Sequence, residues 1–167
     1  YRQADIILTD RPQVTLLMRF ADCVPLLFYD PVRRVVGMAH AGWLGTVRGV
    51  AGAAVVAMQA RFGSRPQDLR AAIGPSIGPD HYEVGADVIL QVKQVFGRDS
   101  TAVLKPVSGR IHFDLWAANR LQLERAAVRQ VEVSDAFARM GVTTTCTCTP
   151  YLIGNKPGVG EHIAWAE

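Results

Sequence analysis

The feature that most constrains this chain is a series of four short apolar segments near its start. They cover residues 6–8, 14–20, 24–28 and 35–39, and turn-forming Asp10-Arg11-Pro12 and Asp30-Pro31 lie between them. Apolar runs of this length, bounded by Asp and Pro, predict β-strands. The last two runs are joined by a tight turn, so we expect them to pair in antiparallel fashion.

Helical patterns follow these strands and mix with further ones. Helices are predicted at residues 46–62, with Thr46 as the N-cap and Gly63 at the end, at 84–96, from Asp114 onward, and at 134–140. Strands are predicted at residues 69–73, 143–149 and 163–166, and residues 74–79 form a constrained Gly-Pro loop. Strands that cluster first and then mix with helices predict an α+β or layered α/β fold without a regular βαβ repeat.

Length and composition restrict the class of protein. The 167 residues fit one domain spanning 1–167, and 49% hydrophobic residues with 20% charged residues are typical of a packed globular protein. The net charge of +3 comes without a run of Lys or Arg, which argues against nucleic-acid binding, and the longest apolar run is far below the roughly 20 residues of a membrane span.

The three cysteines make no paired disulfide framework, which favours the cytoplasm. We expect a monomer. Because the chain opens on Tyr1 without a Met, we expect it to lack an N-terminal segment.

The residues most suited to chemistry are Cys23, at the start of one predicted strand, and His40, at the end of the next. Antiparallel pairing of these strands brings the two positions close together. A thiolate and an imidazole are zinc ligands, but they are equally a nucleophile with its base, and a buried core Cys with a hydrogen-bonded His is a third reading. The small residues Gly42 and Gly45 favour a site, since they leave room for a ligand near the backbone.

Several segments, in order and spacing, resemble the signature blocks of the laccase-domain (YfiH-like) family. They are residues 20–27 (FADCVPLL), 37–46 (GMAHAGWLGT) and 73–79 (IGPSIGP), followed by 82–85, 112–115 and Asn119. The resemblance implies a layered α+β fold of the cysteine-hydrolase-like kind seen in cytotoxic necrotizing factor. It also implies a zinc-dependent purine nucleoside phosphorylase that acts on adenosine, inosine and methylthioadenosine with phosphate, and an adenosine deaminase activity at the same site.

The same resemblance implies a zinc ion held by two histidines and a cysteine. Two of these ligands map onto Cys23 and His40, and the third lies in a His-Gly motif upstream of Tyr1. His81 and His112 are the substitutes that this chain offers, although a solvated or strand-end role suits each better. Asp22 is the nearest residue to orient the attacking group or exchange its proton.

Departures from the family pattern concern phosphate binding. The family commonly has Arg at the position of Leu44, and a guanidinium binds phosphate through two hydrogen bonds. Arg48, one helical turn further on, is the predicted replacement, with Gly74 and Ser76 as further phosphate or substrate contacts. The tail from Tyr151 diverges from the family, and Cys146 and Cys148 are expected to pack in the core.

Two other functions compete with this one. The first is a copper-dependent polyphenol oxidase (laccase), the older description of the family. A multicopper cluster needs many histidines, and this chain has four. The second is a non-catalytic metal-binding homologue that lacks the third ligand.

Overall fold

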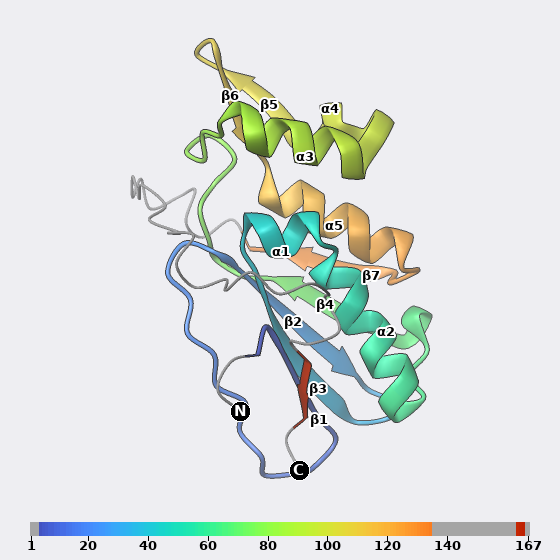
Figure 1. Ribbon diagram of the computed structural model, residues 1–167. Helices are drawn as coiled ribbons and strands as arrows, with labels where there is room; N and C mark the ends of the chain where they lie inside the picture. Colours follow the sequence, from blue (N-terminus) through green and yellow to red (C-terminus); the bar gives the residue numbers. More distant parts are fainter. Residues whose placement is uncertain (1–3, 135–162, 166–167) are drawn as a thin grey trace.

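The computed structural model describes residues 4–134 and 163–165, and a six-stranded sheet lies at its centre (Figure 1). Its strands, in spatial order, are β7 (Gln130–Val133), β4 (Arg70–Ile73), β2 (Val24–Asp30), β3 (Val35–Ala41), β1 (Ile6–Thr9) and β8 (Ile163–Trp165). The four central strands pair in antiparallel fashion, whereas the two edge strands β7 and β8 are parallel to their neighbours. The predicted β2–β3 hairpin is therefore confirmed, and the fold is a mixed α+β one.

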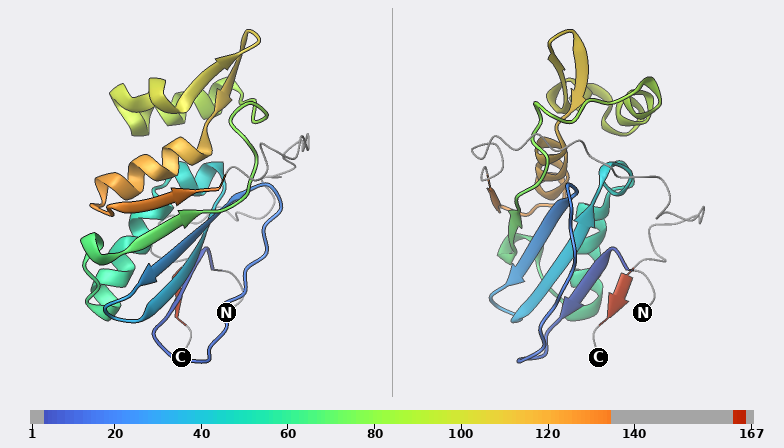
Figure 2. Two further views of the ribbon diagram at one scale, coloured as in Figure 1. Left: turned by 180° about the vertical axis from the view of Figure 1, so that it is seen from behind. Right: turned by 90° about the vertical axis from the view of Figure 1, so that its left-hand side faces the viewer.

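Helices cover one face of this sheet and a smaller layer lies beyond them (Figures 1 and 2). The covering helices are α1 (Trp43–Val47), α2 (Val50–Phe62) and α5 (Leu115–Arg125). The outer layer contains α3 (Ala86–Phe96), α4 (Ser100–Val103) and a hairpin of β5 (Leu104–Val107) with β6 (Arg110–Phe113). Short 3₁₀ turns lie at η1 (Pro66–Asp68) and η2 (Gly97–Asp99). No helix within the described residues is long and apolar enough to cross a membrane.

The two faces of the central strands differ in burial, as the period-two alternation of a strand requires. Along β2 and β3 the residues that face α2, including Leu26, Phe28 and Ala39, are almost fully buried. Their neighbours Leu27 and Tyr29 lie on the opposite face and remain about 40% exposed. His40 belongs to this second, helix-free face.

The helical region 46–62 differs from its prediction because Gly49 breaks it into two helices. Gly49 adopts a left-handed conformation with φ of +82°, which favours glycine and ends α1 before α2 begins. Thr46 is consequently not an N-cap: it is fully buried within α1, and its hydroxyl accepts a hydrogen bond of 3.0 Å from Asn119 Nδ2. The predicted ends at Gly63 and Gly97 are confirmed, and so is Asp114 as the N-cap of α5, where its side chain accepts the Ala117 N–H.

The strand predicted at residues 14–20 is wrong. This segment has no regular structure, and Leu17 is 83% exposed. A strand needs an open neighbour, but β1 already pairs with β3 and β8 on its two sides, so the segment that follows it has no adjacent edge. The predicted helix at 134–140 and strand at 143–149, with Cys146 and Cys148, lie outside the described residues.

Candidate metal centre

Cys23 and His40 lie at the same end of the β2–β3 hairpin. Val24 pairs with Ala41 and Pro25 with His40, so Cys23 comes just before the last paired residues. A Cβ atom added to Gly42 would lie 3.1 Å from Cys23 Sγ and 3.7 Å from His40 Cε1. The thiol and the imidazole therefore border one small space, which has room because residue 42 has no side chain.

Gly42 matters there for space and not for its backbone conformation, because a Cβ atom would lie close to the Cys23 sulfur. Its φ of −68° and ψ of 175° are extended values that any residue adopts. Cys23 is buried, and His40 is half-buried on the face of the sheet that no helix of the described residues covers.

The imidazole of His40 is held by residues from two other segments. Its Nδ1 lies 3.3 Å from Asp5 Oδ1, and its backbone N–H donates a hydrogen bond of 2.8 Å to the Asp5 carbonyl. The ring of Phe20 lies 5.8 Å away, centroid to centroid, at a tilt of 37°. Sequence reasoning did not single out Asp5, although pairing the predicted strand at 6–8 with β3 would have placed it opposite His40.

The 74–79 loop lies beside the Cys23 segment. The Gly74 N–H donates to the Pro25 carbonyl at 2.8 Å, and the Ile77 N–H donates to the Asp22 carbonyl at 3.1 Å. A Cβ atom on Gly74 would lie only 2.9 Å from Pro25 Cγ, so glycine permits this close approach. The backbone of Asp22 thus anchors the loop, and no hydrogen bond or ion pair of its carboxylate is found within the described residues.

The structure gives Ser76 a position unlike that of a phosphate contact. Its side chain is fully buried, accepts a hydrogen bond of 2.6 Å from Trp116 Nε1 and donates to the Gly74 carbonyl at 3.4 Å. These bonds fasten the loop to α5. A role for Gly74 and Ser76 in binding substrate stays a prediction.

Arg48 and Leu44 lie on α1, which leads away from the hairpin end. Leu44 is half-buried in the first turn of α1, near Gly42, whereas exposed Arg48 lies at the C-terminal end of α1. The one-turn separation expected from the sequence is therefore present, but no contact joins Arg48 to Cys23 or His40 among the described residues.

The other two candidate ligands lie on a different part of the fold. His81 Nδ1 lies 2.8 Å from Asp80 Oδ1, and this interaction holds the pKa of the Asp80 carboxyl below its ordinary value. His112 is buried on β6, and its Nδ1 has no hydrogen-bond partner. No group of three or more His, Cys, Asp or Glu residues with metal-binding geometry occurs in the described ranges.

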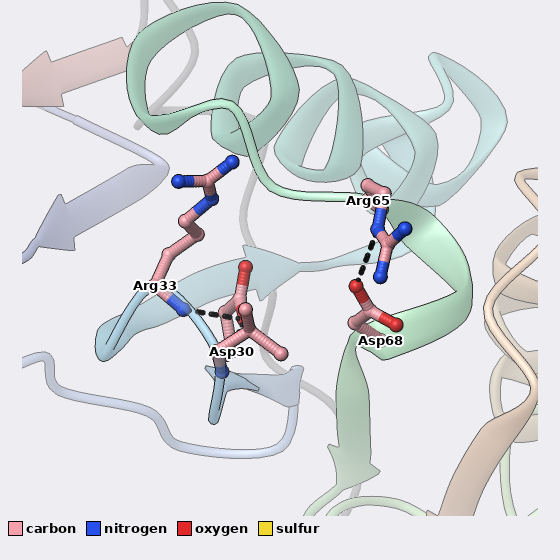
Figure 3. Close-up of polar contacts among 5 residues, drawn as sticks. Asp30, Arg33, Arg65 and Asp68 are labelled. Carbon is pink, nitrogen blue, oxygen red and sulfur yellow. Dashed lines mark hydrogen bonds and ion pairs between the residues drawn. The ribbon is translucent and has the colours of Figure 1, made fainter.

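The opposite end of the hairpin carries a second buried polar group, Asp30 (Figure 3). Its Oδ1 accepts the backbone N–H groups of Val32 and Arg33 at 2.8 and 3.0 Å. Burial raises the pKa of this carboxyl, but the hydrogen bonds from the Ser64 side chain and these two N–H groups outweigh it and lower the pKa below its ordinary value. Figure 3 also shows the exposed pair of Arg65 with Asp68, whose Nε and Oδ2 are 2.7 Å apart.

A thiol and an imidazole that border one space at the end of a central hairpin are candidate ligands for a metal ion. The chain belongs to the family described as multi-copper polyphenol oxidoreductase laccase, whose model matches residues 1–151. This result confirms the family resemblance seen in the sequence.

Relatives named for nucleoside chemistry show strong similarity to the chain. It is 42% identical over 132 residues to a purine nucleoside phosphorylase of Deinococcus radiodurans, covering 79% of this chain and 51% of that protein. It is 36% identical over 158 residues to "Adenosine deaminase RL5" of an unknown prokaryotic organism, covering 94% of this chain and 58% of that protein. The crystal structure of YlmD from Geobacillus stearothermophilus superposes with a TM-score of 0.74 at 41% identity, over 79% of this chain and 50% of that one. The chain therefore spans about half the length of the relatives it matches.

Proposed function

We propose that this chain provides the Cys-His part of the zinc site of a purine nucleoside phosphorylase. It acts on adenosine, inosine or methylthioadenosine with phosphate, and deaminates adenosine at the same site. The observation that carries the proposal is the convergence of Cys23 Sγ and His40 on the space beside Gly42. The names of the similar proteins supply the reaction class.

The residues at this end of the hairpin suit zinc better than copper. A thiolate and an imidazole are ordinary zinc ligands, and a catalytic zinc needs three protein ligands with one open position. Cys23 and His40 supply two, and the third comes from outside the described residues. The four histidines of the whole chain are too few for a multicopper cluster, so the oxidase is the weaker proposal in spite of the family's name.

The protein's own groups have distinct tasks in this proposal. Cys23 and His40 would hold the metal, and a zinc ion bound there would supply a Lewis acid for the attacking water or phosphate. Asp22, whose backbone is fixed by the 74–79 loop, exchanges the proton of the attacking group. Arg48, as the nearest cation on α1, attracts phosphate.

The decisive test is a product analysis of the protein made from its complete gene. Adenosine is supplied with and without phosphate, and adenine and inosine are separated by chromatography. We expect adenine only with phosphate and inosine in both cases, with about one zinc per chain by metal analysis. Cys23→Ala should lose zinc and both products.

A matched control uses another small-residue substitution away from the site. Ala53→Ser on α2 should retain zinc and both activities. Copper in place of zinc, together with oxidation of phenols, would show that the protein is a copper-dependent polyphenol oxidase instead. Zinc without either nucleoside product would leave the non-catalytic homologue.

A further inference from the structure

The carboxylate of Asp5 lies beside one nitrogen of the His40 imidazole, Nδ1. Asp5 precedes β1, and the antiparallel register of β1 with β3, in which Ile6 pairs with Ala39, places it opposite His40. The backbone hydrogen bond from His40 to the Asp5 carbonyl fixes this pairing, and Nδ1 lies 3.3 Å from Oδ1.

This contact distinguishes the two nitrogens of the imidazole. A carboxylate oxygen has no proton to donate, so its position 3.3 Å from Nδ1 favours the tautomer that carries the hydrogen on Nδ1. Nε2 then carries the lone pair, which is the state that a metal ligand needs. Neutral histidine in water favours the opposite tautomer, so the carboxylate reverses the ordinary preference.

We propose that Asp5 is the positioning residue of the site: it holds His40 as the Nδ1–H tautomer, with Nε2 ready to bind a metal. The proposal rests on the proposed function for the identity of the metal, but not for the tautomer. Phe20, with its ring 5.8 Å from the imidazole, limits the rotation of His40 from another side. Two other segments of the chain thus contact the His40 imidazole.

The effect on metal binding follows from the usual role of such carboxylates. Loss of the partner that receives the second ring N–H typically weakens metal binding by about 10- to 100-fold. We expect this loss for Asp5→Ala in the complete gene product. Asp5→Asn keeps an oxygen that can accept from Nδ1–H, so it should recover part of the affinity.

The test combines two measurements on the parent and on both variants. Nitrogen-15 NMR of the metal-free proteins, in alkaline buffer where imidazoles are neutral, reports the tautomer of His40. Competition with a chromophoric chelator reports zinc affinity. Parent protein should show Nδ1–H, Asp5→Ala should shift toward Nε2–H, and its zinc affinity should fall. Asp10→Ala, which removes an exposed carboxylate five positions on, is the matched control and should resemble the parent.

The two proposals fail in different ways. A parent that binds no zinc but has Nδ1–H, lost in Asp5→Ala, contradicts the proposed function and supports the role of Asp5. A parent whose His40 is already Nε2–H overturns the inference, and so does an Asp5→Ala protein with unchanged tautomer and zinc affinity. Thermal unfolding separates these results from misfolding, because Asp5→Ala retains the backbone hydrogen bond to His40.

Discussion

The two ends of the β2–β3 hairpin use buried polar side chains in opposite ways. At the turn end, the carboxylate of Asp30 is fully buried and accepts backbone N–H groups of its own turn. At the open end, His40 is half-buried, and its contacts come from Asp5 and Phe20, which belong to other segments. Cys23 faces the same small space.

This difference separates a polar group that stabilises the fold from one that is available to a ligand. The two backbone hydrogen bonds of Asp30 are local and both go to Oδ1, so they form when the turn forms. The groups around Gly42 come from separate segments and enclose a space. The burial of a polar side chain therefore does not by itself indicate a ligand site. Whether its partners come from its own turn or from separate segments is the better indicator.

The largest effect should come from removing a ligand at the open end. In the complete gene product, zinc at about 100 times its dissociation constant should stabilise the parent by about 2.7 kcal/mol. Cys23→Ala or His40→Ala should lose nearly all of this stabilisation, because a site with one fewer ligand no longer binds at that concentration. Thermal unfolding with and without zinc measures it, and equal zinc-dependent shifts in parent and variants would contradict the site.

The next effect concerns phosphate at the same end. Leu44→Arg introduces a guanidinium into the first turn of α1, and one charge-assisted contact is worth about 1.5–3 kcal/mol, or roughly ten- to a hundredfold in rate. Phosphorolysis should gain this factor while deamination, which needs water alone, should change little. Rates of adenine and inosine formation measure the two reactions, and equal gains in both would show that residue 44 does not contact the phosphate.

At the turn end, Asp30→Ala should destabilise the protein by about 1–3 kcal/mol, because it removes the acceptor of two partly buried N–H groups. Since the folded-state pKa of Asp30 is lowered, the folded protein binds fewer protons than the unfolded one in the acid range. This contribution is present above the unfolded-state pKa and is lost as pH falls through the folded-state value. Urea unfolding between neutral and strongly acidic pH should give a shallower acid loss for Asp30→Asn than for the parent, with zinc affinity unchanged.

The smallest effect should come from the exposed pair of Arg65 and Asp68. Solvent screens its attraction, so Asp68→Asn should unfold at the same urea concentration as the parent. The variant is the control for Asp30→Asn, since it removes a carboxylate near the same turn. If Asp68→Asn lost as much unfolding free energy as Asp30→Ala, burial would not explain why the two carboxylates differ in their effect on stability.

The hairpin and its Cys-His end could be predicted because they depend on local patterns. Alternating apolar residues and the Asp30-Pro31 turn define two adjacent strands, and antiparallel pairing then brings Cys23 to His40. Strand β7 and the β5–β6 hairpin were not predicted, because their four-residue strands carry little periodicity and depend on partners distant in the sequence.

Contacts between residues distant in the sequence also explain what the sequence analysis did not predict for single side chains. Thr46 has the chemistry of an N-cap, but its partner is Asn119, 73 positions away. The hydrogen bond from Trp116 to Ser76 joins residues 40 positions apart, so it could not be seen in the sequence either. Asp5 was missed for the converse reason, since its importance depends on the register between two strands and not on its neighbours in sequence.

The missing side chain of Gly42 affects the space between Cys23 and His40 and not the pairing of the strands. Its backbone conformation suits any amino acid, so the demand for glycine comes only from the space between Cys23 and His40. An alanine methyl at position 42 would lie 3.1 Å from the Cys23 sulfur and 3.7 Å from His40 Cε1, so we expect it to close this space to a ligand while β2 and β3 stay paired.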